Sequence, residues 1–421
     1  SSSRRSFLDH IIPTMNEFLA RRTLYNEKQS LTKKKIHHEP SKPEFNQEKN
    51  SNSCIRVKKS LVFDFDDENV KIYTIYDVHG NLVELKFDKN KNIPRGVLQV
   101  IGLTLSYHVS LNKITMNRGI NNTVIYEINN WLSLSRISEV CLDSANIKNG
   151  NIALLLESEN CLTNLSLARC KIDDDVVKQI AINLVYPLPA SKTLSLLNLA
   201  SNIISDAGVK YLAEALQTNR YLVYLNLADN SISDEGFDAM LQVLSEFEVS
   251  WEQMKAYMIR YIEHWTEKQK LLTEKLEAVH DSAKSKKSSK HAAANLSTRK
   301  QKGGQGERDL YFKMSVEEDD FEDPFFRKNM HAKDGVLYCY GNNCLAYLNV
   351  SYNDITYVSV KKLLTVLTYQ KIMERKPKGL VNVSLEGNCI PAGCVELKEI
   401  DEILTFDLFD RNKRLSVKHS K

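Results

Sequence analysis

The sequence predicts an α/β solenoid, in which each repeat contributes one short strand and one helix to a common stack. The main observation is the phrase L-x-x-L-x-L-x-x-N-x-I, which begins at Leu194, Leu222 and Leu345, with Val350 for the third leucine in the copy at Leu345. An apolar stretch at helical spacing follows it, for example over residues 209–216. Because one strand and one helix cannot bury their own apolar face, such units must be stacked. Function is then expected on a binding surface and not in a catalytic pocket.

Further copies of the phrase extend the stack in both directions. The copy at Leu162 carries Cys170 in place of the asparagine, and the last copy begins at Leu380. A weaker copy begins at Ile137, and a worn one at Leu111. Successive starts lie roughly thirty residues apart, which suits a repeat with a full helix on its outer side.

The asparagine position of the phrase has a structural explanation. The side chain turns inward as the chain leaves the strand, where an amide can satisfy backbone groups that the turn buries. We therefore expect Cys170, Asn202, Asn230, Asn353 and Asn388 to hold the turns and to touch no ligand.

Composition limits the possible partners. The chain has 421 residues, of which 42% are hydrophobic and 26% charged, which is ample for a core. A net charge of +4 does not call for nucleic acid, and no apolar run approaches the roughly 20 residues of a membrane span. We expect protein partners, with neither nucleic acid nor membrane among them.

The sequence contains no motif for a catalytic, cofactor or metal site. The phosphate-binding loop and the metalloprotease and esterase motifs are absent from it. The eight cysteines form no C-x-x-C pair, so reduced buried thiols are the simpler reading and a zinc site the alternative. The run from Asp173 to Asp175 follows a strand, and helix capping explains it better than metal binding.

Two segments precede the repeats. Residues 1–53 predict a short amphipathic helix, with apolar positions between Phe7 and Leu19, followed by a flexible tail. Residues 54–106 are rich in β-branched and aromatic residues, with a turn signal at His79-Gly80-Asn81. A small β-rich cap over the open end of the solenoid is expected there.

The rest of the chain divides into five segments. Residues 107–245 and 336–395 hold the first and second blocks of repeats. Between them, residues 246–281 predict a long helix that continues the helix of the Leu222 repeat. Residues 282–335 predict a disordered insertion, basic and then acidic. Residues 396–421 predict a closing cap and a basic tail.

The long helix carries an apolar stripe that includes Trp251, Met258 and Trp265. This stripe either packs back on the repeats or forms a protruding surface for a partner, and both alternatives stay open. The acidic and aromatic piece at residues 317–326 either folds back on the preceding lysines or serves as a linear motif.

A second candidate surface lies on the strands. Residues between the inward-pointing leucines face away from the core and line the inner side of a curved solenoid. Tyrosine and asparagine are frequent here, and both are effective interface residues. The predicted partner-binding residues on this side are Asn164, Ser166, Asn198, Tyr224, Asn226, Asp229, Tyr347, Asn349 and Tyr352.

These repeats resemble the ribonuclease-inhibitor type of leucine-rich repeat, which implies a horseshoe arc with parallel strands on the concave face and helices on the convex face. A longer order of features is similar to the leucine-rich-repeat-containing protein 71 family: Asn219 to Asn230, a lysine-rich interruption, Lys333-Asp-Gly-Val336 and Lys376-Pro-Lys-Gly-Leu380. This resemblance covers roughly residues 135–400. It implies a non-enzymatic scaffold subunit of motile cilia and sperm flagella, located in the cytoplasm and the axoneme.

Three classes of function are therefore weighed. The first is an axonemal or cytoskeletal adaptor, whose partners are axonemal or microtubule-associated proteins. The second is a soluble inhibitor or sensor module. The third is a regulator of a small GTPase, which would need a distinctive polar group of residues on the loops that follow the strands.

Overall fold

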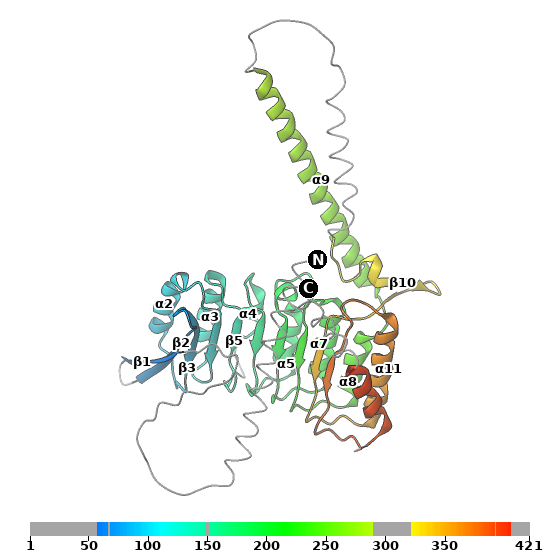
Figure 1. Ribbon diagram of the computed structural model, residues 1–421, viewed down its shortest axis with the longest axis horizontal. Helices are drawn as coiled ribbons and strands as arrows, with labels where there is room; N and C mark the ends of the chain where they lie inside the picture. Colours follow the sequence, from blue (N-terminus) through cyan, green and yellow to red (C-terminus); the bar gives the residue numbers. More distant parts are fainter. Residues whose placement is uncertain (1–56, 66–67, 148–150, 289–320, 392, 406–421) are drawn as a thin grey trace, which may run out of the picture. The chain divides into compact units, whose positions relative to one another are not determined.

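A computed structural model describes residues 57–65, 68–147, 151–288, 321–391 and 393–405 (Figure 1). The chain divides into two units, residues 1–53 and 54–421, and every described residue belongs to the second. The helix and tail expected in residues 1–53 thus lie outside the described residues. The same holds for most of the basic part of the insertion and for the expected basic tail.

The described residues contain a ten-stranded sheet that runs through all the repeats (Figure 1). Its order is β1-β2-β3-β4-β5-β6-β7-β8-β12-β13. The first three strands pair antiparallel, and every later neighbour pairs in parallel. The bounds are β1 Val57–Phe65, β2 Glu68–Tyr76, β3 Leu82–Phe87, β4 Lys113–Met116, β5 Glu139–Cys141, β6 Asn164–Ser166, β7 Leu196–Asn198, β8 Tyr224–Asn226, β12 Tyr347–Asn349 and β13 Asn382–Ser384. The expected α/β leucine-rich-repeat solenoid is confirmed.

The leucines of the phrase form one continuous core. Leu165, Leu197, Leu225 and Leu348 are neighbours in register on four successive strands, and none is more than 1% exposed. The core continues from the first repeats to the last. A strand that slipped by one residue would turn its leucines out of this core, which fixes the register of every repeat.

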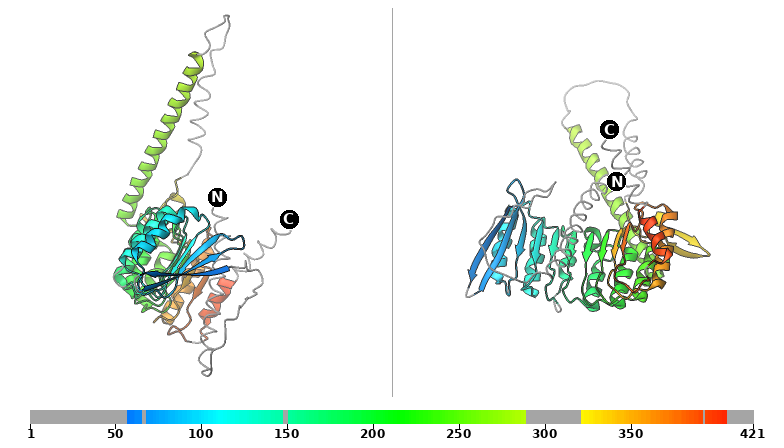
Figure 2. Two further views of the ribbon diagram at one scale, coloured as in Figure 1. Left: turned by 90° about the vertical axis from the view of Figure 1, so that its left-hand side faces the viewer. Right: turned by 60° about the horizontal axis from the view of Figure 1, so that its bottom comes forward.

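Helices cover one face of the sheet (Figure 2). Most of them begin at a residue whose side chain accepts a hydrogen bond from the first turn, as Asp173, Ser205, Ser233 and Thr356 do. The helices are α2 Arg95–Thr104, α3 Asn122–Leu134, α4 Leu154–Glu157, α5 Asp174–Asn183, α6 Ala190–Thr193, α7 Asp206–Thr218, α8 Asp234–Leu244 and α11 Tyr357–Met373, with a short 3-10 helix η1 at Leu105–Tyr107.

The asparagines of the phrase form a ladder between repeats. Asn202 Oδ1 accepts hydrogen bonds from the backbone N–H groups of Cys170 (2.9 Å) and Ile172 (3.1 Å) in the preceding repeat. Its Nδ2 donates to the carbonyls of Leu167 (2.9 Å) and Leu199 (2.8 Å). Equivalent bonds are made by Asn230, Asn353 and Asn388. Each side chain thus ties two successive turns together.

The repeats begin earlier than the phrase predicts. β3 pairs in parallel with β4, and α2 follows it, so Leu82 starts another strand-and-helix unit. Asn90 is 4% exposed and exchanges hydrogen bonds with the N–H (2.8 Å) and carbonyl (3.1 Å) of Lys71. Phe87 replaces the third leucine, which obscured this copy. The β-rich cap expected over residues 54–106 is therefore reduced to β1 and β2 in the described chain.

An insertion separates β8 from β12 in the sequence but not in the sheet. Its elements are β9 Phe247–Glu248, α9 Trp251–Ser288, the 3-10 helix η2 Arg327–Asn329, β10 Met330–Lys333 and β11 Val336–Cys339, and its strands form a small sheet of order β10-β11-β9. The N–H of Asn342 donates to the carbonyl of Val243 at 2.8 Å. The chain therefore leaves and rejoins the solenoid at one point, and β12 pairs with β8 as a direct successor would.

The insertion corrects three expectations. α8 ends at Leu244 and does not run into α9, because β9 lies between them. Residues 321–335, expected to be disordered, are ordered because Phe321, Phe325 and Phe326 supply buried apolar area that the charge run concealed. Residues 336–339 form β11 of the insertion, so the second block of repeats starts after them.

The far end of the solenoid is closed by a helical segment at residues 395–405. Ile400 and Leu404 of this segment are buried and join the main core. Over the part of the chain that the structure describes, no helix combines the length and apolar composition needed to cross a bilayer.

Candidate interaction surfaces

The side chains between the leucines form two rungs across the sheet on the side facing away from the main core; we call this side the strand face. One rung joins Asn164, Leu196, Tyr224 and Tyr347 in register, and the rings of the two tyrosines lie 6.3 Å apart. The other rung joins Ser166, Asn198, Asn226 and Asn349. The structure thus brings together seven of the nine residues predicted here.

Burial divides the predicted strand-face residues into three groups. Asp229 and Tyr352, which follow the strands, are exposed. Asn164, Tyr347 and Asn349 are half-buried. Four others are buried, which differs from the expectation of an open surface: Ser166, Asn198, Tyr224 and Asn226.

Three of the predicted binding asparagines hold their own turns. The side-chain oxygens of Asn198, Asn226 and Asn349 accept hydrogen bonds from the N–H groups two residues further on, at 3.2, 3.1 and 3.0 Å. A short amide at the end of a strand reaches that N–H readily, which is a turn preference of asparagine. Sequence reasoning assigned these amides to a partner, although the turn already engages their oxygens.

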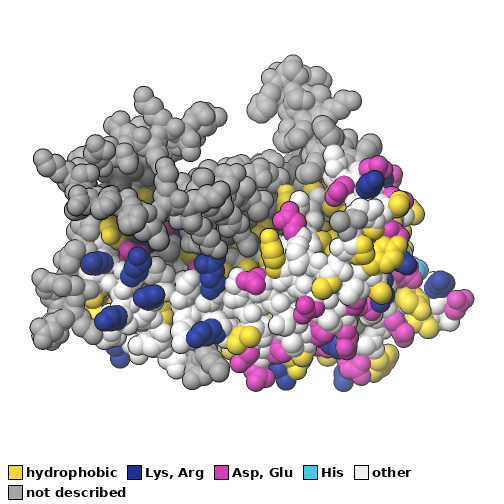
Figure 3. Space-filling model, turned by 90° about the horizontal axis from the view of Figure 1, so that it is seen from below, with side chains coloured by type: hydrophobic (Ala, Val, Ile, Leu, Met, Phe, Trp, Pro, Cys, Tyr) yellow, Lys and Arg dark blue, Asp and Glu magenta, His cyan; other side chains and the backbone are white. Residues whose placement is uncertain are grey.

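The loops that follow the strands form a second surface, which we call the loop row. Arg169, Ser201, Asp229 and Tyr352 occupy equivalent positions and all have φ between 57° and 59°. The N–H of each bonds to a carbonyl of the next repeat, for example Arg169 to Ala200 at 2.9 Å. Figure 3 shows one face of the molecule, with Lys and Arg gathered over the first repeats and Asp and Glu over the later ones.

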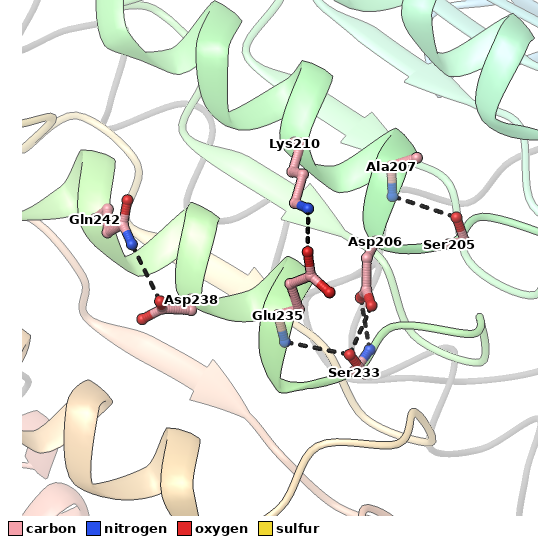
Figure 4. A network of polar contacts seen from close by, with 8 residues as sticks. All are labelled: Ser205, Asp206, Ala207, Lys210, Ser233, Glu235, Asp238 and Gln242. Atoms are coloured by element: carbon pink, nitrogen blue, oxygen red, sulfur yellow. Dashed lines mark hydrogen bonds and ion pairs between the residues drawn. The ribbon is translucent and has the colours of Figure 1, made fainter.

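Aspartates at the helix starts link successive repeats (Figure 4). The carboxylate of Asp206 accepts hydrogen bonds from Ser233, through its N–H at 2.8 Å and its hydroxyl at 2.6 Å. Asp174 binds Ser205 in the same way, and Asp234 binds Thr356. Within the acidic run, Asp173 caps α5, which is the role that the sequence favoured, and Asp174 links α5 to the next repeat.

Helix α9 begins with reciprocal capping. The hydroxyl of Ser250 accepts a hydrogen bond from the N–H of Gln253 (3.2 Å), and the Gln253 side chain accepts one from the N–H of Ser250 (2.9 Å). Two N–H groups at the helix start are thereby satisfied.

One side of α9 packs on the core of the insertion. Tyr257 is 8% exposed, and its ring lies 6.1 Å from that of Phe321. Tyr261 and His264 also contact Phe321, with ring centroids 5.6 and 5.0 Å away. Residues 321–326 of the acidic and aromatic piece therefore fold against α9.

The adjoining side of α9 presents apolar residues to solvent; we call this side the α9 stripe. Trp251 is 76% exposed, Ile262 59%, Met258 46% and Trp265 38%. Ile259 beside them is also exposed. Large exposed apolar groups in a row mark interaction sites on otherwise polar proteins. The structure thus exposes Trp251, Met258 and Ile262, whereas Met254 packs on the core of the insertion and the ring of Trp265 lies 6.2 Å from that of Tyr261.

Arg260 anchors α9 both to the segment around Asp323 in the insertion and to the solenoid. Arg260 Nε donates to Asp323 Oδ2 at 2.7 Å, and the Asp323 side chain is fully buried. The guanidinium lies over the ring of Tyr186, whose hydroxyl donates to the Glu322 carbonyl at 2.8 Å. Burial and the Asp323 carboxylate raise the pKa of Tyr186, so the phenol stays protonated as this donor.

Sequence reasoning missed the residues that join the insertion to the repeats. Asn342 is fully buried, and its Nδ2 donates to the carbonyls of Leu216 and Asn219, both at 2.9 Å. Asn219 has the equivalent place one repeat earlier, three residues before the phrase. The pattern N-x-x-L-x-x-L, seen at both positions, was the available signal.

The described residues include potential metal ligands and several thiols. Among them, His, Cys, Asp and Glu side chains nowhere gather in threes in a way that suits a metal ion. Burial raises the pKa of the Cys141 and Cys170 thiols to about 12, so both stay protonated at neutral pH. The Cys170 thiol donates instead to the Leu142 carbonyl at 3.1 Å.

Comparison with known proteins agrees with this fold. A family model described as leucine-rich repeat matches residues 190–213, 218–241 and 341–364. The third match begins at Gly341, where the chain rejoins the solenoid after the insertion. The search of curated proteins finds no match. Leucine-rich repeats are generally modules for binding other proteins.

Proposed function

We propose that this protein is a non-catalytic scaffold for protein–protein interaction and that the α9 stripe is its principal docking surface. The observation that carries the proposal is the combination of an exposed apolar stripe with a rigid base. Trp251 and Met258 face solvent, while Tyr257 on the same helix is buried. Hydrophobic residues on a fixed helix can bind a partner with little loss of conformational freedom.

The way in which the insertion joins the solenoid supports this proposal. The hydrogen bond from Asn342 to Val243 closes the repeats beneath it, and β8 and β12 remain paired. The insertion therefore adds a surface without interrupting the core. A chain of this kind holds one partner on α9 and has the strand face and loop row for others.

The proposal extends to an axonemal adaptor of motile cilia or flagella, with axonemal or microtubule-associated proteins as partners. Its support is the order of sequence features shared with the leucine-rich-repeat-containing protein 71 family. Two of these features contact the insertion or lie within it: Asn219-Arg220 bonds to Asn342 and Cys339, and Lys333 to Val336 spans the turn between β10 and β11. The feature at Lys376 to Leu380 follows α11. The resemblance therefore concerns the attachment of the insertion as well as the repeats.

Expression of the tagged chain in multiciliated cells tests both parts. Wild type is expected to stay with detergent-extracted axonemes, and Met258→Asp with Ile262→Asp to be released. Glu263→Gln with Glu267→Gln, on exposed positions of the same helix, is the matched control and should be retained. Circular dichroism checks that each variant is folded.

Each outcome decides between the classes. Diffuse wild-type protein would reject the axonemal role and leave the soluble inhibitor or sensor. Retention of the Met258→Asp, Ile262→Asp variant would reject the α9 stripe as the docking surface. An accelerated turnover of GTP by a small GTPase would favour the regulator class instead.

A further inference from the structure

The loop row separates charge along the solenoid. Arg118 follows β4, and Arg169 and Lys171 follow β6. Asp229 follows β8, and Glu386 follows β13. All five side chains are exposed. The exposed charged side chains of the row are thus basic in the first half of the repeats and acidic in the second, while Asp143, which follows β5, is half-buried and accepts hydrogen bonds from Ser166 and Ala168.

The change of sign occurs at one repeat. Ile203, in the loop after β7, is 53% exposed and lies between the basic and the acidic positions. In the sheet, β6 and β8 are the two neighbours of β7, and β4 and β13 each lie three strands away from it. Arg169 and Asp229 are therefore placed symmetrically about Ile203, and so are Arg118 and Glu386.

This symmetry makes the row complementary to itself. A two-fold axis at Ile203 would bring β6 of one copy opposite β8 of the other, so that Arg169 and Lys171 face Asp229. The same axis brings Arg118 opposite Glu386. Because strands repeat at the same spacing in both copies, about 4.8 Å apart, all these pairs meet in one register.

We propose that two copies of this chain associate antiparallel through their loop rows, with Ile203 at the axis. A partner of uniform charge, such as a nucleic acid, would match one half of the row and be repelled by the other. A second copy matches both halves. The interface is isologous, and its charge pairs set the register while Ile203 supplies apolar contact at the centre.

Sedimentation velocity of the purified chain over a concentration series tests this association. We expect a monomer–dimer equilibrium that weakens when NaCl is raised from about 50 mM to about 500 mM, because exposed charge pairs are screened. A wild-type chain that stays monomeric at every concentration in low salt would overturn the proposal. So would a dimer that is insensitive to salt.

Charge exchange tests the register. Arg118→Glu with Arg169→Glu and Lys171→Glu, and separately Asp229→Lys with Glu386→Lys, should each weaken self-association by tenfold or more. An equimolar mixture of the two variants should form a mixed dimer. Failure of the mixture to associate, with both variants folded by circular dichroism, would reject the antiparallel arrangement. Glu214→Lys on α7, an exposed residue outside the row, is the control and should dimerise as wild type does.

Discussion

The solenoid and the insertion differ in how they satisfy buried polar groups and cover apolar surface. Both must satisfy buried polar groups and cover apolar surface. The solenoid repeats one solution, with an asparagine at 202, 230 and 353 bonding to the same backbone positions in each turn. The insertion uses a single arrangement, in which the fully buried Asp323 is held by Arg260 and by the N–H of Phe325.

This difference predicts how each region fails. In the solenoid, each repeat is stabilised by its interfaces with the neighbouring repeats, so a substitution that destabilises one repeat also destabilises its neighbours. The insertion has its own small core around Phe325 and Cys339, separate from the main one. It should therefore open locally while the repeats remain folded.

Leu225→Asp should have the largest effect. Leu225 is 0% exposed, so the variant places an unpaired carboxylate in the continuous core at a cost of about 5 kcal/mol or more. We expect loss of the cooperative thermal transition measured by circular dichroism. Tyr352→Asp, at a residue 60% exposed, should melt close to wild type. A Leu225→Asp protein that keeps its repeats and loses only the insertion would reverse the contrast.

Arg260→Ala should open the insertion alone. It leaves the Asp323 carboxylate buried without its partner, which costs about 3–5 kcal/mol. Hydrogen exchange should speed up in residues 251–265 and 321–339 and stay unchanged in residues 194–244. Arg327→Ala, an exposed cation of the same insertion, is the control and should leave all rates unchanged. Equal acceleration in the repeats would show that the two regions form one cooperative unit.

Much of the solenoid could be predicted because its signal recurs. A phrase that places Leu225 and Leu348 at the same offset defines strand, register and core together, and the asparagine positions follow. The copy at Leu82 was missed because Phe87 and Asn90 stand within a segment whose composition suggested strands alone. Recurrence, and not composition, carried the reliable information.

The insertion could not be predicted to the same extent. Nothing repeats in it, and the pairing of Arg260 with Asp323 joins residues far apart in the sequence. Composition indicated disorder up to residue 335 because charge outweighs the few aromatic residues. On the strand face, the sequence placed Tyr224 and Asn226 outward correctly, but it could not show that both are buried. Burial depends on three-dimensional packing that no local pattern encodes.

Gly208→Ala should have an intermediate effect within the repeats. A Cβ at Gly208 would lie 2.4 Å from Asp174 Oδ1 and 2.7 Å from Ile204 Cγ2. The carboxylate that it displaces holds the N–H groups of Ser205 and Gly208. We expect a loss of about 1–3 kcal/mol in chemical denaturation. Gly96→Ala, in α2 with nothing within 4 Å, is the matched control and should gain about 0.5–1 kcal/mol. A gain of stability in both variants would show that the aspartate links between successive repeats tolerate displacement.

The aspartate links between successive repeats should also make the stability of the repeats sensitive to acid, with the smallest change in stability among these predictions. Burial raises the pKa of Asp234, but hydrogen bonds from Ser359 and Thr356 outweigh it and bring the pKa below the ordinary value of 3.8. The unfolded chain then binds this proton more readily than the folded one. The stabilisation is present above the unfolded pKa and is lost as pH falls through the folded one.

Asp234→Asn should therefore be less stable at neutral pH and should lose less further stability between about pH 5 and about pH 3. Thermal unfolding at a series of pH values measures this slope. Some slope should remain, because hydrogen bonds from Asn81 and Tyr357 lower the pKa of Asp77 and Glu396 as well. Asp354→Asn, at an exposed position of the loop row, should keep the wild-type slope. If Asp234→Asn also keeps the wild-type slope, the acid response does not come from the bonds between α8 and α11. The aspartate bonds would then stabilise the repeats less than the Arg260–Asp323 ion pair stabilises the insertion.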